Sequence, residues 1–287
     1  MRTPLRTNSI AIGLLVCLTA GTALLTGCGG DSEASYVYDN FADARAASDG
    51  KPILIDFYTD WCRFCKQMDT VTFKDSTVAA FLEDNILVAK VNAEVDSALA
   101  QSYNVTGYPT LVLVQPDGSE IDRFIGFYPP DQFLPTLSGY LQGEGTFGEL
   151  KRTAALAADP ITNIRLAEKY QQRQQVDKSL QLLDEALSIG TSDSLAADIM
   201  LRKANAYFMG QRYNDAAETF KSIGNEYPGS FGAEQAGYYL GMLYERLGDT
   251  TNAVDAYLKF VRDFPQSQAA TRVKTHAESL KQAYSGS

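Results

Sequence analysis

An apolar run followed at once by two closely spaced cysteines is the feature that most constrains this chain. The run from Ile53 to Tyr58 contains one charged residue, Asp56, and Cys62 and Cys65 follow it. A continuous apolar run of this length suits a strand covered on both faces, as in a central parallel sheet. Residues 62 to 71 then show helical spacing. The two thiols are therefore expected at the start of a helix that follows a buried strand.

The first 27 residues have the composition of a targeting segment. Two arginines precede an apolar stretch from Ile10 to Leu25, which is short for a membrane span and is followed by small residues. The sequence Leu25-Thr26-Gly27-Cys28 resembles the lipobox of bacterial lipoproteins, in which the cysteine is acylated and becomes the first residue of the mature protein. A plain secretory signal is the alternative interpretation.

The lipobox resemblance implies a lipid anchor on Cys28. Several acyl chains, at about 0.8 kcal/mol for each buried CH₂ group, hold a protein stably on a membrane surface. Residues 28 to 35 are polar and are expected to form a flexible tether. The resemblance thus implies an extracytoplasmic lipoprotein on the periplasmic face of the envelope. Gly29 stands where an aspartate would favour the inner membrane in such families, so the outer membrane is slightly favoured.

Of the four cysteines, only one pair is left for thiol chemistry. Cys17 lies in the targeting segment and Cys28 in the lipobox, so only Cys62 and Cys65 remain, too few for a further structural disulfide. Their spacing also suits zinc, but a closed zinc site takes about four ligands. The only histidine, His276, is far away in the sequence. Redox chemistry is therefore favoured over metal binding, and no metal or separate cofactor is expected.

Residues 36 to 143 alternate between helical and strand patterns. Asn40 is expected to cap the first helix and Ser76 a later one. An alternation of this kind indicates an α/β domain. The expected elements are a helix at 41–47, a strand at 53–58, helices at 62–71 and from 76, a strand at 86–92, a helix at 98–103, a hairpin over 111–127 and a helix at 130–142.

Three stretches of this domain together form a specific pattern. They are Asp56 to Lys66, Thr72-Phe73 with Asp75, and Gly107 to Thr110 followed by the hairpin. They resemble thioredoxin, and most of all the periplasmic thioredoxin domain of the transmembrane thiol:disulfide interchange proteins. The resemblance implies a thioredoxin-like domain with a central mixed sheet flanked by helices. It also implies a thiol:disulfide oxidoreductase that works through a redox-active Cys62–Cys65 disulfide.

Cys62 is the expected attacking thiolate. At the N-terminus of a helix, unpaired backbone amides favour the thiolate over the thiol, and Arg63 adds a permanent positive charge. We expect Cys62 to be exposed and to form a mixed disulfide with the substrate. Cys65, one turn inside the helix, is then expected to attack the Cys62 sulfur and release the reduced partner.

Two carboxylates are candidates for proton transfer. Asp56 lies inside an apolar strand, where a carboxylate is either satisfied by neighbours or kept for proton transfer. It resembles the buried acid that serves the inner cysteine in the thioredoxin family. Asp69 matches a second acidic position four residues after Cys65. For Asp69, a proton relay and a solvated helix charge remain equally open.

Pro109 resembles the cis-proline of this family, whose loop lies beside the disulfide and pairs with the substrate backbone. A trans proline before a strand is the alternative. Tyr108, an unusual residue at its position, either selects substrates or packs. Trp61 is expected to cover the disulfide, with a core role as the alternative. Arg63-Phe64 replaces the glycine-proline of thioredoxin, so the redox potential does not carry over.

Residues 144 to 287 contain an internal repeat. Pro228-Gly229-Ser230 and its counterpart after Phe264 mark loops between units that resemble tetratricopeptide repeats, whose basic period is 34 residues. The first unit, 164–189, lacks the proline ending and is the weakest match. The positions that recur every 37 residues are Tyr170, Tyr207 and Tyr244, then Leu180, Ala217 and Val254, then Leu183, Phe220 and Tyr257.

Each repeat unit is expected to be a helix pair in an all-α domain. A stack of such pairs presents a concave surface to an unknown protein or peptide partner. The recurring tyrosines are more readily explained as core than as a binding stripe. The expected helices are 196–209 with 213–227, 233–247 with 251–264, and a final helix at 269–283.

Charge and motifs together limit the function. A formal charge of −10 disfavours nucleic acid as a partner, because phosphate backbones would be repelled. We expect a membrane-anchored oxidoreductase that reduces oxidised substrate proteins and takes electrons from a membrane donor of the thiol:disulfide interchange type. The alternative is a repeat-based scaffold or chaperone for envelope assembly, in which the thioredoxin domain only binds.

Overall fold

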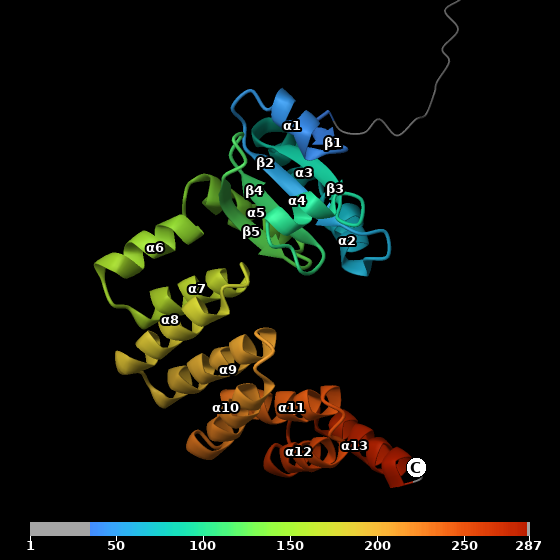
Figure 1. The fold of residues 1–287 in the computed structure, drawn as a ribbon, viewed down its shortest axis with the longest axis vertical. Coiled ribbons are helices and arrows are strands. Elements are labelled where there is room, and N and C mark those ends of the chain that lie inside the picture. The colour runs from blue at the N-terminus through green and yellow to red at the C-terminus, as the bar shows by residue number, and fades with distance from the viewer. Residues whose placement is uncertain (1–34, 286–287) are drawn as a thin grey trace, which may run out of the picture. The chain divides into compact units, whose positions relative to one another are not determined.

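The computed structural model describes residues 35–285 (Figure 1). The expected targeting segment, Cys28 and nearly all of the expected tether lie outside this range, so these expectations stay predictions. Within the described range, none of the helices combines the length and the apolar character that crossing a bilayer requires.

A five-stranded mixed sheet is the centre of the N-terminal domain, as the resemblance implied. The strand order is β1-β3-β2-β4-β5, in which β1, β3 and β2 run parallel, while β4 is antiparallel to both β2 and β5. The apolar run predicted as a buried strand is β2, which lies in the middle of this sheet. The strands are β1 (Val37–Tyr38), β2 (Ile53–Tyr58), β3 (Leu87–Asn92), β4 (Thr110–Val114) and β5 (Glu120–Ile125).

Helices flank this sheet, and most of them begin where the sequence predicts. Asn40 caps the first helix by accepting a hydrogen bond from the Asp43 backbone N–H at 2.9 Å. The cap expected at Ser76 was wrong, because Asp75 accepts from Thr77 and Val78 instead. The helices are α1 (Phe41–Ala47), α2 (Arg63–Gln67), α3 (Ser76–Asn85), α4 (Ser97–Ser102) and α5 (Pro130–Leu141).

The helix expected over residues 62 to 71 is not regular. After α2 the chain widens into a π-helical turn, η1 (Met68–Thr72), in which the Phe73 N–H donates to the Met68 carbonyl five residues earlier at 2.9 Å. Met68 is fully buried, and its sulfur accepts the backbone N–H of Tyr128 at 3.4 Å. Packing against the segment before α5 thus accompanies the change of helical pitch.

The C-terminal region is all α-helical and is built of antiparallel pairs (Figure 1). In the predicted pairs, three helices start slightly earlier than the sequence indicates, two of them after a serine cap at Ser192 or Ser230, and the helix at Tyr213 starts where it was predicted. The helices are α6 (Phe147–Leu156), α7 (Pro160–Gln171), α8 (Val176–Ser188), α9 (Asp193–Met209), α10 (Tyr213–Glu226), α11 (Phe231–Arg246), α12 (Thr250–Asp263) and α13 (Ala270–Ser285).

The positions that recur every 37 residues form the core of this helical region. Leu183, Phe220 and Tyr257 are 3% exposed or less. The recurring tyrosines are half-buried, and Tyr207 and Tyr244 pack on one hydrophobic cluster. The prediction that they serve packing therefore fits Tyr207, whereas Tyr244 also lines a groove of the helical region.

A buried group of charges joins the sheet to the helical region. We call it the ionic junction, and it consists of Glu120, Asp122 and Arg123 on β5 with Lys169 and Arg173 at and after the end of α7. Asp122 lies 2.8 Å from the Lys169 ammonium, and Arg173 contacts Glu120 at 2.6 Å. These contacts link residues about fifty positions apart in the sequence, and no sequence pattern indicated them.

Candidate active site

Cys62 and Cys65 form a disulfide at the start of α2. Cys62 is the N-cap of this helix, and its sulfur accepts the backbone N–H of Cys65 at 3.0 Å. The Cys62 N–H donates in turn to the Thr59 carbonyl at 3.1 Å, which fixes the turn between β2 and α2. The outer sulfur therefore receives a hydrogen bond that would stabilise a thiolate there after reduction.

The expected difference in exposure between the two cysteines is wrong for this oxidised state. Cys62 is 4% exposed and Cys65 is 3% exposed. The turn before α2 packs Cys62 almost as tightly as the helix packs Cys65. What separates the two sulfurs is their place on the helix, because only Cys62 occupies the cap.

A lysine on β3 holds both candidate carboxylates. The Lys90 ammonium lies 2.6 Å from Asp56 Oδ2 and 2.5 Å from Asp69 Oδ1. Asp56 is 1% exposed, and it lies beside Lys90 in the register of the parallel strands β2 and β3. Among residues 35–285, no hydrogen-bond donor reaches Asp56 Oδ1, which is also buried. One oxygen of this carboxyl group is thus held by a cation while the other has no partner.

Burial raises the pKa of Asp56, and the negative charge of Asp69 raises it further, although Lys90 opposes both effects. Burial by itself would lower the pKa of Lys90, but the two carboxylates outweigh it, and the pKa of Lys90 is raised. An acid whose pKa is raised holds a proton more readily than an exposed aspartate does, and the neighbouring Lys90 cation stabilises its anion once the proton leaves. Asp56 therefore has the chemistry required of a proton acceptor for a thiol.

Sequence reasoning missed Lys90. The signal was present as a single lysine inside the predicted apolar strand at 86–92, the counterpart of the anomaly already recognised at Asp56. Which neighbours a charged strand residue meets depends on strand order. The parallel pairing of β2 with β3 supplied that information.

Exposed aromatic side chains surround the disulfide. Trp61 and Phe64, on either side of Cys62 in the sequence, are 68% and 55% exposed. The Trp61 ring meets the Tyr108 ring edge-on at 6.0 Å between centroids, and its indole N–H donates to Glu94 at 2.9 Å. Trp61 is thus a surface residue held by two partners, which does not fit the alternative of a core role.

The loop before β4 contributes the other predicted residues. The Tyr108–Pro109 peptide bond is cis, as expected. The Pro109 carbonyl accepts the backbone N–H of Gly126 at 2.8 Å, so this loop is fastened to the end of β5. Arg63, predicted to add a positive charge beside Cys62, is exposed on the first turn of α2. The structure therefore brings Tyr108 to Trp61 from a position more than forty residues away.

Metal binding finds no support in the part of the chain that the structure describes, where no three histidine, cysteine or acidic residues gather as a ligand set. His276 is half-exposed on α13 and lies 2.9 Å from Glu245.

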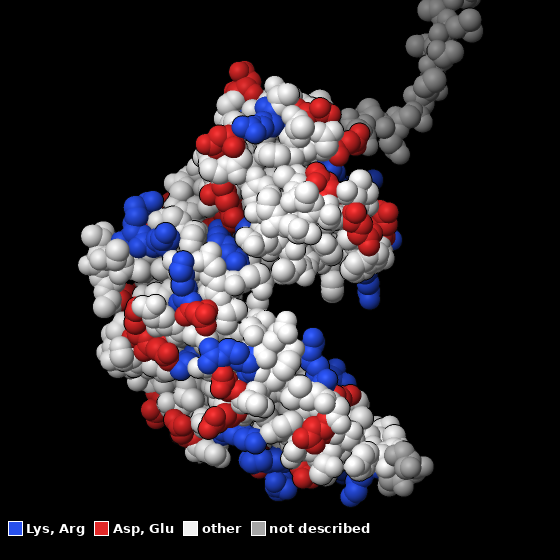
Figure 2. Space-filling view, in the orientation of Figure 1, with Lys and Arg blue, Asp and Glu red and all other residues white. Residues whose placement is uncertain are grey.

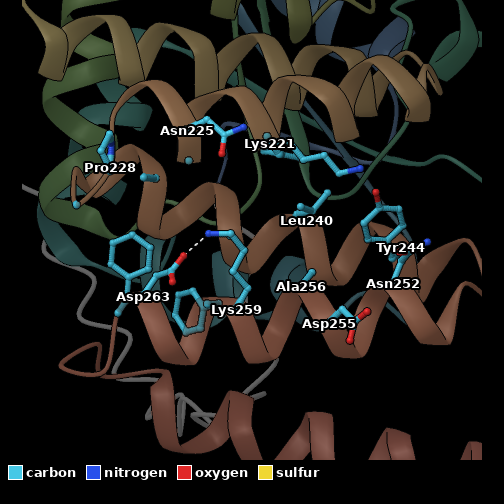
Figure 3. A pocket seen from close by; sticks show the side chains of 17 residues that line it. Lys221, Asn225, Pro228, Leu240, Tyr244, Asn252, Asp255, Ala256, Lys259 and Asp263 are labelled. Carbon is cyan, nitrogen blue, oxygen red and sulfur yellow. Dashed lines mark hydrogen bonds and ion pairs between the residues drawn. The ribbon is translucent and has the colours of Figure 1, made fainter.

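The helical region contains a groove of about 620 Å³ that is a second candidate site (Figure 3). The groove lies between α10 and α12, and residues of α11 such as Leu240 line it as well. Lys259 pairs with Asp263 on one rim, while Lys221 lies over the Tyr244 ring. Positive and negative side chains are interspersed over this helical region (Figure 2). A groove with this mixed rim suits an amphipathic protein segment better than a nucleic acid.

Comparison with known families agrees with both parts of the fold. Residues 40–140 match the thioredoxin-like domain family. Residues 198–230 and 235–267 each match the tetratricopeptide repeat family, and these segments fall on the α9–α10 and α11–α12 pairs. The chain thus carries a thioredoxin-like domain, with a Cys62–Cys65 disulfide of the redox-active type, followed by tetratricopeptide repeats.

Individual relatives match only the first of these parts. The thiol:disulfide interchange protein DsbD of Ralstonia nicotianae is 36% identical over 96 residues, which are 32% of this chain and 16% of that protein. Thioredoxin Y2 of Arabidopsis thaliana chloroplasts is 35% identical over 105 residues, which are 37% of this chain and 60% of that protein. The chain therefore spans less than two thirds of the length of either relative.

A solved structure likewise matches about a third of this chain. A thioredoxin from Thermus thermophilus is 29% identical, with a TM-score of 0.34 over 37% of this chain and 86% of that one.

Proposed function

We propose that this protein is a membrane-anchored, extracytoplasmic thiol:disulfide oxidoreductase that reduces disulfides in substrate proteins. The observation that carries the proposal is the buried Asp56, which has one oxygen held by Lys90 and one without a partner, on the strand that leads to the Cys62–Cys65 disulfide. A buried carboxylate without a full set of partners is costly for folding, so a role in proton transfer explains its presence.

The reaction transfers two electrons from the dithiol to the substrate. The Cys62 thiolate attacks one sulfur of the substrate disulfide, which forms a mixed disulfide and releases one substrate thiol. Cys65 then loses its proton to Asp56 and attacks the Cys62 sulfur, which restores the intramolecular disulfide and releases the second substrate thiol. An external dithiol must reduce the disulfide again before the next cycle.

The reductive direction is part of the proposal, and a relative supports it. The matching protein of Ralstonia nicotianae is named a thiol:disulfide interchange protein. We therefore assign the supply of electrons to a membrane donor of this type, and the repeats to binding a protein partner. The lipobox-like sequence at Cys28 supports attachment to the periplasmic face of the envelope, with the outer membrane favoured by Gly29.

Turnover of insulin disulfides with a dithiol donor tests the enzyme proposal. The wild-type protein should accelerate the reaction, and Cys62→Ser should abolish the acceleration because no mixed disulfide can form. Equal rates for the two proteins would contradict the proposal and favour a scaffold or chaperone in which the thioredoxin domain only binds. Cys65→Ser should in turn trap the natural substrates as mixed disulfides on Cys62.

Membrane recovery tests the anchor separately. Cys28→Ser should leave the protein soluble or unprocessed, because acylation needs the cysteine thiol. Wild-type levels of this variant in the membrane fraction would count against lipidation while leaving the redox chemistry untouched.

A further inference from the structure

A cleft of about 470 Å³ lies between the loop that leads to cis-Pro109 and the first helices of the repeat region. On the side of the thioredoxin-like domain it is lined by Gly107 and by Ile125 at the end of β5. On the other side it is lined by Gln171 at the end of α7 and Met209 at the end of α9. Two different parts of the chain therefore contribute its walls.

The loop that lines this cleft also contributes to the exposed aromatic side chains around the disulfide. Gly107 lines the cleft, and the next residue, Tyr108, meets Trp61 edge-on. Trp61 directly precedes Cys62. One short loop therefore has residues at both places, with Gly107 in the cleft and Tyr108 beside Trp61.

Direct contacts hold the two walls together. The side-chain amide of Gln174, after α7, donates to the Thr106 hydroxyl of the loop at 3.0 Å. Behind this contact lies the ionic junction, where Arg173 and Lys169 meet Glu120 and Asp122. Removing one partner of a buried ion pair is strongly unfavourable, so these pairs keep the walls at a fixed spacing.

The lining indicates the chemistry of an occupant. Ile125 and Met209 are 40% and 43% exposed, which offers two apolar contacts on opposite walls. The side-chain amides of Gln171 and Gln174 already donate to Ser179 and Thr106, and the Oε1 atom of Gln172 is buried without a donor among the described residues. The glutamines are therefore suited to accept hydrogen bonds from backbone N–H groups. Glu168 is already paired with Arg202. These features favour an extended, largely uncharged segment with an apolar side chain.

We infer that this cleft binds the segment of a substrate protein that flanks its reactive cysteine, so that the repeats form a second part of the substrate site. The inference rests on the proposed function and narrows its substrate class. The preferred substrates are disulfides in extended polypeptide segments, and small disulfides lack the part that fills the cleft.

A pair of disulfide-linked peptides tests this assignment on the mature full-length protein. The short peptide has one residue on each side of its cysteine, and the long one has about eight uncharged residues on each side, with apolar side chains among them. A single turnover from the reduced protein is followed by the fluorescence of Trp61, the only tryptophan of the chain. The long peptide should react about tenfold faster, a typical discrimination for one small apolar contact.

Met209→Glu should remove this preference for length, because it sets a carboxylate against the apolar part of the segment. Met209→Ser removes the contact without adding charge and should lose most of the preference as well. Met242→Glu is the matched control, since Met242 is 45% exposed on α11 and does not line the cleft. It should keep the wild-type preference.

The outcomes separate this inference from the function it rests on. A wild type that reduces both peptides at equal rates overturns the cleft assignment and leaves the oxidoreductase proposal standing. The same holds if both Met209 variants keep the preference for the long peptide. A wild type that reduces neither peptide overturns the proposed function, and the cleft assignment falls with it.

Discussion

Two buried aspartates, Asp56 and Asp122, lie in the same sheet but differ in how many hydrogen-bond and ion-pair partners they have. Both are at most 1% exposed. Asp122 accepts hydrogen bonds from two backbone N–H groups and meets the cations of Lys169 and Arg173, so both of its oxygens are satisfied. Asp56 meets Lys90 through one oxygen, and its other oxygen has no donor within residues 35–285.

The comparison separates Asp122, a structural carboxylate that stabilises the fold, from Asp56, a chemical carboxylate that is proposed to transfer a proton. Two backbone N–H groups and two cations hold Asp122, so it suits a permanent joint between β5 and α7. An incompletely satisfied carboxylate is destabilised as an anion, so burial raises the pKa of Asp56 and makes protonation accessible. Similar burial therefore leads to opposite roles, and the number of partners decides between them.

The largest expected effect comes from breaking the structural carboxylate. Asp122→Ala leaves the buried Lys169 without its carboxylate partner and Arg173 with Glu120 alone, and should lower the free energy of unfolding by about 3–5 kcal/mol. Urea denaturation followed by circular dichroism measures the change. Asp84→Ala, an exposed carboxylate on α3, is the control and should stay within about 0.5 kcal/mol of wild type. An equally small effect for Asp122→Ala would show that the ionic junction adds no stability.

The chemical carboxylate should matter for rate. Asp56→Asn cannot accept the Cys65 proton, and should slow insulin reduction about a hundredfold near neutral pH while the protein still folds. The measurement is the turnover rate with a dithiol donor between about pH 6 and pH 8. Rates equal to wild type over this range would remove Asp56 from the mechanism.

The same substitution should change how stability depends on pH. Because the pKa of Asp56 is raised on folding, the folded wild type holds a proton that the unfolded chain releases above about pH 4. The wild type therefore loses stability as pH rises through the folded pKa, whereas Asp56→Asn has no such charge to form. As the pH rises above about 4, the difference in the free energy of unfolding between variant and wild type should therefore shift in favour of the variant. A difference that stays constant with pH would contradict the raised pKa.

The smallest effect is expected at Asp69. Its side chain is 43% exposed, and Lys90 keeps its contact with Asp56 when Asp69 is neutralised. Asp69→Asn should therefore cost only about 0.2–1 kcal/mol in the free energy of unfolding. Its effect on the rate of insulin reduction decides between the relay and the solvated charge. A slowing as large as that of Asp56→Asn would assign the relay, and an unchanged rate would leave Asp69 as a surface charge.

The sequence by itself determined the local elements and the nature of the chemistry. The apolar run of β2 and the cap at Asn40 are local patterns, and the repeat is visible because equivalent positions return every 37 residues. The thiol pair could be recognised because Cys62 and Cys65 belong to a single helical turn. Signals of this kind need only neighbouring residues or a fixed period.

Only the tertiary structure decided which charges meet. Lys90 reaches Asp56 because two strands pair in parallel, and Lys169 reaches Asp122 because α7 packs against β5. Packing against the segment before α5 likewise accompanies the π-helical turn at Met68, and the turn between β2 and α2 buries Cys62. The physical reason is that a charge or a sulfur has its environment set by groups distant in the sequence, and these become neighbours only when the sheet and the helices have packed.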